Sequence, residues 1–137
     1  MTQFTSVENF VGLYTGVYDG RLAGLQIDRD GTSLRLTYTE VERGETFVGV
    51  QHVPDQSVHT LTGISLINTK DANRVLWWPM LNIHTWNIDY LSGLSYYFPQ
   101  AAARNSLDWI LEYGYQWNML YGISFTRRIP ATPGVGP

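Results

Sequence analysis

The chain has 137 residues and a formal charge of −3, and 15% of its residues are charged against 44% hydrophobic and 14% aromatic. This length favours one domain, and the scattered basic residues, with Lys70 as the only lysine, exclude the basic surface that nucleic acid requires. The absence of cysteine excludes disulfides and thiolate metal sites.

The N-terminal residues, MTQFTSVENFVGLY, have neither the positively charged start nor the long apolar run of a signal peptide. Apolar runs elsewhere are far shorter than the roughly 20 residues of a membrane-spanning helix. We therefore expect a soluble, cytoplasmic protein with no membrane partner. A signal peptide removed before the first residue of this sequence is the alternative.

The first half of the chain alternates β-forming and polar residues, with turn sequences at short intervals. This pattern predicts strands at 9–18, 21–28, 33–41 and 45–53. The turns between them fall at Asp19-Gly20, Arg29-Asp30-Gly31 and Glu42-Arg43-Gly44. Because Asp-Gly is a favoured two-residue turn, neighbouring strands are expected to pair as antiparallel hairpins.

The second half continues this pattern and then departs from it. Three further strands are predicted at 58–67, 74–86 and 88–98. Pro79 marks a bulge, an edge or a division within the second of these. Ala, Leu and Glu at helical spacing predict a short helix at 101–113, and a last strand follows at 115–128. The Pro/Gly-rich residues 130–137 are expected to form a flexible tail.

Eight strands in chain order with tight connections describe an antiparallel meander. Closing such a meander into a barrel removes its exposed edges. We therefore predict an all-β fold, an eight-stranded antiparallel up-and-down β-barrel over residues 1–129 with one short helix before the last strand. A two-sheet sandwich is the alternative, because the sequence does not show whether the first and last strands pair.

A short phrase recurs in the strands, as LTGISL (61–66), LSGLSY (91–96) and LYGISF (120–125). Alternation puts its Leu, Gly and Ser on one face and the bulkier residues on the other. We expect the bulky face to line the barrel and the glycines to lie where the sheet curves. The alternative is that Gly and Ser face inward and leave space for a ligand. The serines do not form a nucleophile elbow, because no second glycine follows them.

The polar and aromatic residues between 74 and 90 are the densest candidate site. With unbroken alternation, Trp78, Asn82, His84 and Trp86 share one face. Two indoles with an amide and an imidazole are typical of a small-molecule pocket. The alternative is a face that packs under another subunit or under the predicted helix.

His84 is the best candidate for acid or base chemistry, with Asp89, Glu40 or Tyr90 as its partner. A lone histidine among aromatic residues also serves as a simple hydrogen-bonding group. No spacing of His, Asp and Glu matches a metal site, and no glycine-rich loop matches a phosphate site. We therefore expect neither a metal nor a cofactor.

The opening SVENFVGLYTG resembles the start of calycin proteins, in which x-N-F precedes Gly-x-Trp, with Tyr14 at the tryptophan position. The segments HTWNIDYLSG (84–93) and QWNMLYGISFTRR (116–128) resemble two strands of avidins. The resemblance implies a calycin-like barrel with Thr85, Trp86 and Trp117 in its ligand pocket. The asparagine and serine ligands of the first avidin hairpin have no match in GVYDGRLAG, so the resemblance does not extend to biotin binding.

These features predict a binding protein for an apolar or aromatic small molecule. The residues expected to hold the ligand are Tyr14, Tyr38, Trp78, Thr85, Trp86, Tyr90 and Trp117. One alternative is a cofactor-independent enzyme of the cyclase, isomerase or dehydratase type that uses the same cavity with His84 as acid or base. A second is a sugar-binding lectin. So few charges over so much apolar surface also predict a homo-oligomer, either a dimer or a tetramer.

Overall fold

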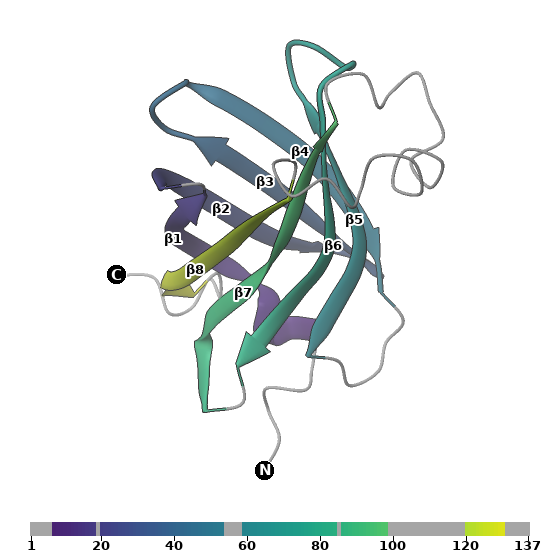
Figure 1. Ribbon diagram of the computed structural model, residues 1–137. Helices are drawn as coiled ribbons and strands as arrows, with labels where there is room; N and C mark the ends of the chain where they lie inside the picture. The colour runs from purple at the N-terminus through teal and green to yellow at the C-terminus, as the bar shows by residue number, and fades with distance from the viewer. Residues whose placement is uncertain (1–6, 19, 54–58, 85, 99–119, 131–137) are drawn as a thin grey trace.

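The computed structural model describes residues 7–18, 20–53, 59–84, 86–98 and 120–130, which form a closed barrel (Figure 1). A short 3-10 helix, η2 (Val7–Phe10), precedes the barrel. The first four strands are β1 (Gly12–Tyr18), β2 (Arg21–Asp30), β3 (Ser33–Glu40) and β4 (Glu45–His52). The others are β5 (Thr60–Asn68), β6 (Val75–His84), β7 (Asn87–Phe98) and β8 (Leu120–Pro130).

Each strand pairs antiparallel with the next along the chain, and β8 closes the barrel against β1. The closing pair runs from Gly12 opposite Pro130 to Tyr18 opposite Ile123. The predicted up-and-down barrel is therefore confirmed and the sandwich is excluded. The β1–β2, β3–β4 and β5–β6 connections share one end of the barrel, which we call the hairpin end. The opposite end, near η2, is the η2 end (Figure 1).

In β1 to β4 the alternation seen in the sequence decides which side chains fill the barrel. The inward side chains are buried: Tyr14, Tyr18, Leu25, Ile27, Leu34, Leu36, Tyr38 and Phe47. Burying one large apolar side chain stabilises a fold by roughly 1.5–3 kcal/mol. Outward neighbours such as Gln26 and Arg35 are exposed, so these strands have one core face and one outer face.

The η2 end is closed by the segment before β1 and by an arginine of the last strand. Phe10 is fully buried, and its carbonyl oxygen accepts a hydrogen bond from the Tyr14 hydroxyl at 2.7 Å. The Arg127 guanidinium lies over the Tyr14 ring, 5.5 Å from its centroid. It also donates to the carbonyls of Val11 and Ile88, both at 2.8 Å. Tyr14 and Arg127 thus tie β1, β7 and β8 together.

The pairing of β5 with β6 is interrupted at one position. Thr62 pairs with Met80 and Ile64 with Trp78, but the residues between them, Gly63 and Pro79, are not paired in the ladder. Gly63 has a φ of +65°, a left-handed conformation that glycine adopts most readily. Pro79 has no N–H to donate to the ladder. Inward alternation shifts by one residue here, so that Trp78 and Leu81 are both buried.

This shift corrects the expectation that Trp78, Asn82, His84 and Trp86 share one face. Trp78 lies inside the barrel with 0% exposure, whereas Asn82 and His84 lie on the outer wall and Trp86 is 82% exposed. Pairing between β6 and β7 also changes register between Trp77 and Met80. A one-residue change of register moves every later side chain to the opposite face. The irregularity predicted at Pro79 is therefore what divides the predicted site.

The repeated glycine phrase has opposite orientations in different strands. In β8 the bulky residues Ile123 and Phe125 face inward as predicted, and so do Ile64 and Leu66 in β5. Leu61 was predicted to face outward but is buried as well, because the alternation of β5 shifts at Gly63. In β7 the prediction is wrong, since Leu91 and Ser95 are buried while Leu94 is exposed. A Cβ added at Gly93 would overlap the carbonyl oxygen of Met80. Because the interior of a small barrel has limited volume, small residues on β7 leave room for the aromatic rings of other strands.

The helix predicted at 101–113 lies outside the described residues, as does the tail beyond residue 130. The first residues of the last predicted strand, before Leu120, lie outside them as well. Within the described part of the chain, no helix has both the length and the hydropathy needed to cross a membrane.

Candidate functional site

An aromatic cluster occupies the barrel interior, with Tyr38 at its centre. The centroid of the Tyr38 ring lies 5.7 Å from Tyr18, 6.1 Å from Phe47, 5.5 Å from Trp78 and 6.2 Å from Phe125. These distances fall in the range where aromatic pairs attract. The five rings come from β1, β3, β4, β6 and β8, so closure of the barrel brings them together. We call this group the Tyr38 cluster.

Two hydrogen-bond donors of the Tyr38 cluster lack a partner within the described part of the chain. The Tyr38 hydroxyl and Trp78 Nε1 are buried, and neither has a hydrogen-bond partner among the described residues. An unpaired buried polar group costs roughly 1–3 kcal/mol, and native proteins keep few of them. These two donors belong to rings in edge-to-face contact, with centroids 5.5 Å apart.

Polar groups at the hairpin end adjoin the cluster. Glu40 is only 5% exposed at the end of β3, and its Oε1 lies 3.0 Å from Arg43 Nε. Burial, and after it the negative charge of Glu40, raises the pKa of Tyr38 well above its usual range. Tyr38 therefore keeps its proton at neutral pH and remains a donor. Nearby, Ser95 donates a hydrogen bond of 3.1 Å to the Tyr18 hydroxyl.

The structure brings Tyr38 and Trp78 together as parts of one site, and both were predicted to hold a ligand. Tyr14, also predicted, lies at the η2 end, where its hydroxyl is bonded to the backbone. Thr85 and Trp117 lie outside the described residues.

The other predicted residues form a separate group on the outer wall. The His84 ring lies 5.2 Å from Trp86 and 4.7 Å from Tyr90. Glu40, one of the partners considered for His84, is buried at the hairpin end instead. Asp89 is ion-paired at 2.9 Å with an arginine of β8. The pocket predicted from the sequence is thus divided into an interior part and an exterior part.

Sequence analysis missed four members of the interior part: Tyr18, Phe47, Ser95 and Phe125. Alternation alone could find Tyr18 and Phe47, because they have the same parity as the other inward residues of β1 and β4. Ser95 was predicted to face outward and is buried. Ser95 and Tyr18 are 77 residues apart in the sequence, so their contact cannot be predicted from a local sequence pattern.

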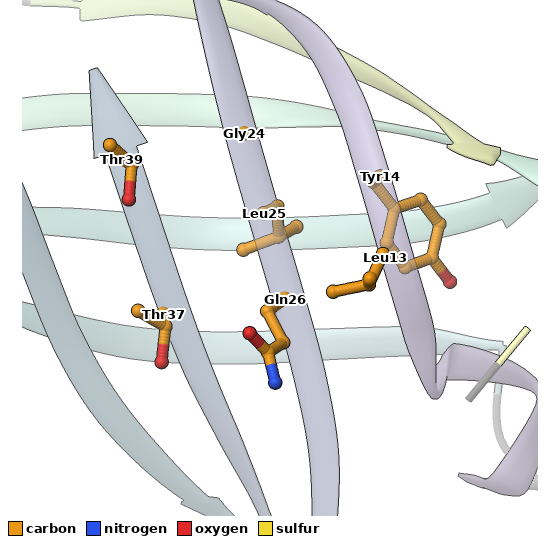
Figure 2. Close-up of a pocket in the computed structure, with 7 residues that line it drawn as sticks. All are labelled: Leu13, Tyr14, Gly24, Leu25, Gln26, Thr37 and Thr39. Carbon is orange, nitrogen blue, oxygen red and sulfur yellow. The ribbon is translucent and has the colours of Figure 1, made fainter. Parts of the chain in front are cut away.

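A shallow depression of about 210 Å³ lies on the outer wall over β1, β2 and β3 (Figure 2). Gly24 on β2 lies between Thr39 on one side and the β1 residues Leu13 and Tyr14 on the other (Figure 2). A Cβ added at Gly24 would meet only the Tyr14 carbonyl oxygen, at 3.9 Å. The missing side chain of Gly24 therefore leaves the outer wall hollow at this point.

The described residues contain no group of three or more His, Asp or Glu placed to hold a metal ion. No family model, no curated protein and no solved structure matches the chain. The geometry and chemistry of the interior and exterior groups are therefore the basis for a functional assignment.

Proposed function

We propose that this protein binds an apolar or aromatic small molecule inside the barrel, at the Tyr38 cluster. The observation that carries the proposal is the pair of buried donors without partners, the Tyr38 hydroxyl and Trp78 Nε1. A ligand acceptor bonded to them removes the penalty of the unpaired state. The rings of Phe47 and Phe125 then cover the apolar body of the ligand, as in other small-molecule sites.

The chemistry of the cluster defines the class of ligand. Both unpartnered groups donate, so the ligand carries an acceptor such as a carbonyl, an ether oxygen or a ring nitrogen. The donors present positive hydrogens, which disfavours a cation, and the Glu40 carboxylate disfavours an anion. The expected ligand is therefore a neutral, largely apolar molecule with one or two acceptor atoms.

The fold supports the same class of function. The closed meander, with the Gly12-Leu13-Tyr14 segment at the start of β1, is consistent with the calycin-like relationship that the sequence suggests. Eight-stranded barrels are just wide enough for side chains or for one small ligand. These features support the proposal that the chain is a calycin-like binding barrel.

The enzyme alternative needs an acid or base beside the ligand. His84 lies on the outer wall, and Trp86 and Tyr90, rather than the Tyr38 cluster, are its aromatic neighbours. Burial and the charge of Glu40 keep Tyr38 protonated at neutral pH, so its hydroxyl donates rather than abstracts a proton. The Glu40 carboxylate itself is ion-paired with Arg43 and Arg21 at the hairpin end. Binding without turnover is therefore the function that we propose.

The test compares Tyr38→Phe with Tyr90→Phe, a matched loss of one hydroxyl on the outer wall. Freshly purified wild-type protein is first examined by native mass spectrometry for a retained small molecule. It is then titrated with a panel of aromatic ketones, ethers and nitrogen heterocycles while tryptophan fluorescence is recorded. We expect saturable binding that Tyr38→Phe weakens about tenfold, since loss of one hydrogen bond of about 1.4 kcal/mol has that effect.

Tyr90→Phe should bind as the wild type does. A flat response across the panel, together with no retained molecule, contradicts the proposal. So does saturable binding that Tyr38→Phe leaves unchanged, because the ligand then lies elsewhere.

A further inference from the structure

The aromatic group at the β6–β7 turn has the features of a second binding site, separate from the Tyr38 cluster. Trp86 is 82% exposed, the largest exposure of any large apolar side chain in the described part of the chain. The His84 ring supports the indole from the side at 5.2 Å and packs in turn on Tyr90 at 4.7 Å. An exposed indole with such neighbours is a flat apolar platform in contact with water.

Polar groups surround this platform. A depression of about 300 Å³ lies beside Trp86, and its polar lining comes from His59, Thr60, Asn82, His84 and Ser92. The carbonyl of His59 accepts a hydrogen bond of 2.9 Å from the Ile83 N–H, which fixes this residue against β6. His84 Nε2 lies 2.9 Å from Ser92 Oγ, so β6 and β7 are joined across the floor of the depression.

Two further observations define what the depression can bind. Asn82 Oδ1 is a buried acceptor with no donor among the described residues, so a hydroxyl or another hydrogen-bond donor of a ligand would satisfy it. The lining contains no Asp, Glu, Lys or Arg side chain to form an ion pair with a phosphate, carboxylate or ammonium group. The ligand is therefore uncharged, carries hydroxyl groups and has one flat apolar face.

We propose that this depression binds a neutral sugar, with the apolar face of one pyranose ring stacked on Trp86. Hydroxyl groups both donate and accept, so they satisfy Asn82 Oδ1 and also bond to the imidazoles and hydroxyls of the lining. A volume of about 300 Å³ lies at the lower limit of small-molecule sites. The site thus holds a single ring, and the rest of a glycan extends into solvent.

A protein partner is the competing occupant of an exposed tryptophan. The fully buried centre of a protein interface is mostly apolar and extends over several side chains. Among the described residues, none of the other exposed large apolar side chains lines the depression beside Trp86. A single exposed indole with polar neighbours therefore favours a small hydroxylated ligand over an apolar protein surface.

The experiment uses the full chain with two probes that distinguish the source of the sugar. The first probe is an array of immobilised neutral oligosaccharides, and the second is a set of free methyl pyranosides titrated by NMR. Trp86→Ala and Asn82→Ala remove the platform and the acceptor. The control is Trp77→Ala, a half-buried outer-wall tryptophan that packs on Tyr96 rather than on His84.

We expect binding to at least one neutral glycan, weakened tenfold or more by Trp86→Ala, reduced by Asn82→Ala and unchanged by Trp77→Ala. Binding on the array alone identifies a glycan chain as the ligand, and binding of the methyl pyranosides identifies the single ring as sufficient. The proposal is overturned if neither probe binds, or if binding survives Trp86→Ala.

It is also overturned if Trp86→Ala converts an oligomer to a monomer, because the indole then lies in a subunit interface. Tyr38→Phe should not change sugar binding, because Tyr38 lies inside the barrel. The sugar-site proposal and the interior-site proposal can therefore fail independently of each other.

Discussion

The Tyr38 ring meets the Trp78 indole edge-on inside the barrel, with centroids 5.5 Å apart and an interplanar angle of 77°. Both rings are fully buried, and the polar atom of each has no partner among the described residues. The contact between the two rings stabilises the core, whereas the two unpaired polar atoms lower the stability of the ligand-free protein. Local conflicts of this kind are typical of functional sites.

Tyr38→Phe should raise the free energy of unfolding of the ligand-free protein by about 1 kcal/mol, because the substitution removes an unpaired buried hydroxyl and keeps the ring. Urea unfolding followed by tryptophan fluorescence measures this change. Tyr14→Phe is the matched control, since its hydroxyl donates to the Phe10 carbonyl. The control should lose about 1 kcal/mol. Equal losses in the two variants would show that the Tyr38 hydroxyl is paired.

The sequence predicted the barrel because its strands and turns are local features. Each hairpin from β1 to β4 has alternating residues and a turn with glycine, and these patterns require no knowledge of distant contacts. Closure needed only the inference that exposed strand edges are unfavourable.

The candidate site was predicted less well, because the faces of β6 and β7 depend on one irregular position. Pro79 was recognised as a break, but its effect on parity could not be derived from the sequence. A count of alternate residues across Pro79 places Trp78 and His84 together, and the structure places them on opposite sides of the wall. The contact between Ser95 and Tyr18 depends on barrel closure and has no local signal.

Arg127→Ala should destabilise the barrel by about 2–4 kcal/mol, as measured by thermal and urea unfolding. The Arg127 side chain is only 9% exposed. Its guanidinium forms an ion pair with Asp89 and donates hydrogen bonds to the carbonyls of Val11 and Ile88. Its removal takes this donor from the part-buried carbonyls of Val11 and Ile88 and removes the packing of the guanidinium on the Tyr14 ring. Arg128→Ala is the control, because that side chain is exposed and donates a hydrogen bond to the Thr15 hydroxyl. Its loss should cost less than about 1 kcal/mol. Similar losses at both positions would contradict the proposed tie between β1, β7 and β8.

Tyr14 should make stability fall at alkaline pH. Burial raises its pKa from 10.0 to about 12, although Arg127 opposes the increase. The folded protein therefore holds this proton in a range where the unfolded chain has lost it. Its contribution is fully present below about pH 10 and is lost as the pH rises through about 12.

Urea unfolding at a series of pH values should show a steeper alkaline loss in wild type than in Tyr14→Phe, by up to about 2–3 kcal/mol. Some dependence should remain in the variant, because the pKa of Tyr38 is raised as well. Identical slopes in the two proteins would mean that the Tyr14 hydroxyl is solvated in the folded state.

Gly93→Ala and Gly122→Ala should differ, although both glycines belong to the same repeated phrase. A Cβ at Gly93 would overlap the Met80 carbonyl oxygen, whereas a Cβ at Gly122 meets nothing within 4 Å. Overpacking against a backbone atom costs about 2–3 kcal/mol, so Gly93→Ala should lower the melting temperature clearly. Gly122→Ala should be neutral or slightly stabilising, because alanine restricts the unfolded chain. An unchanged melting temperature in Gly93→Ala would contradict the close approach of Gly93 to the Met80 carbonyl oxygen.

Three exposed apolar side chains, Val17, Leu22 and Val41, lie together on the outer wall near the hairpin end. Val17 is 47% exposed and Leu22, directly opposite it, is 55% exposed. Val41 is 52% exposed, and its N–H donates to the Leu22 carbonyl, so the three side chains form one row. The depression above Gly24 adjoins this row, because Gly24 is the next outward position of β2 after Leu22. Protruding side chains beside a hollow on the same surface are self-complementary, as a two-fold interface requires.

We propose that two copies of this chain meet through this row, and Leu22→Lys should then give a monomer in sedimentation velocity runs in which the wild type is a dimer. A lysine there places two positive charges near the two-fold axis of the interface, and like charges without water between them repel strongly. Val50→Lys is the matched control, because Val50 is 62% exposed on β4, away from the row, and the variant should sediment as the wild type does. A wild type that remains monomeric at high concentration contradicts the prediction. Loss of the dimer in Val50→Lys, with Leu22→Lys unaffected, would place the interface on the wall around β4 instead.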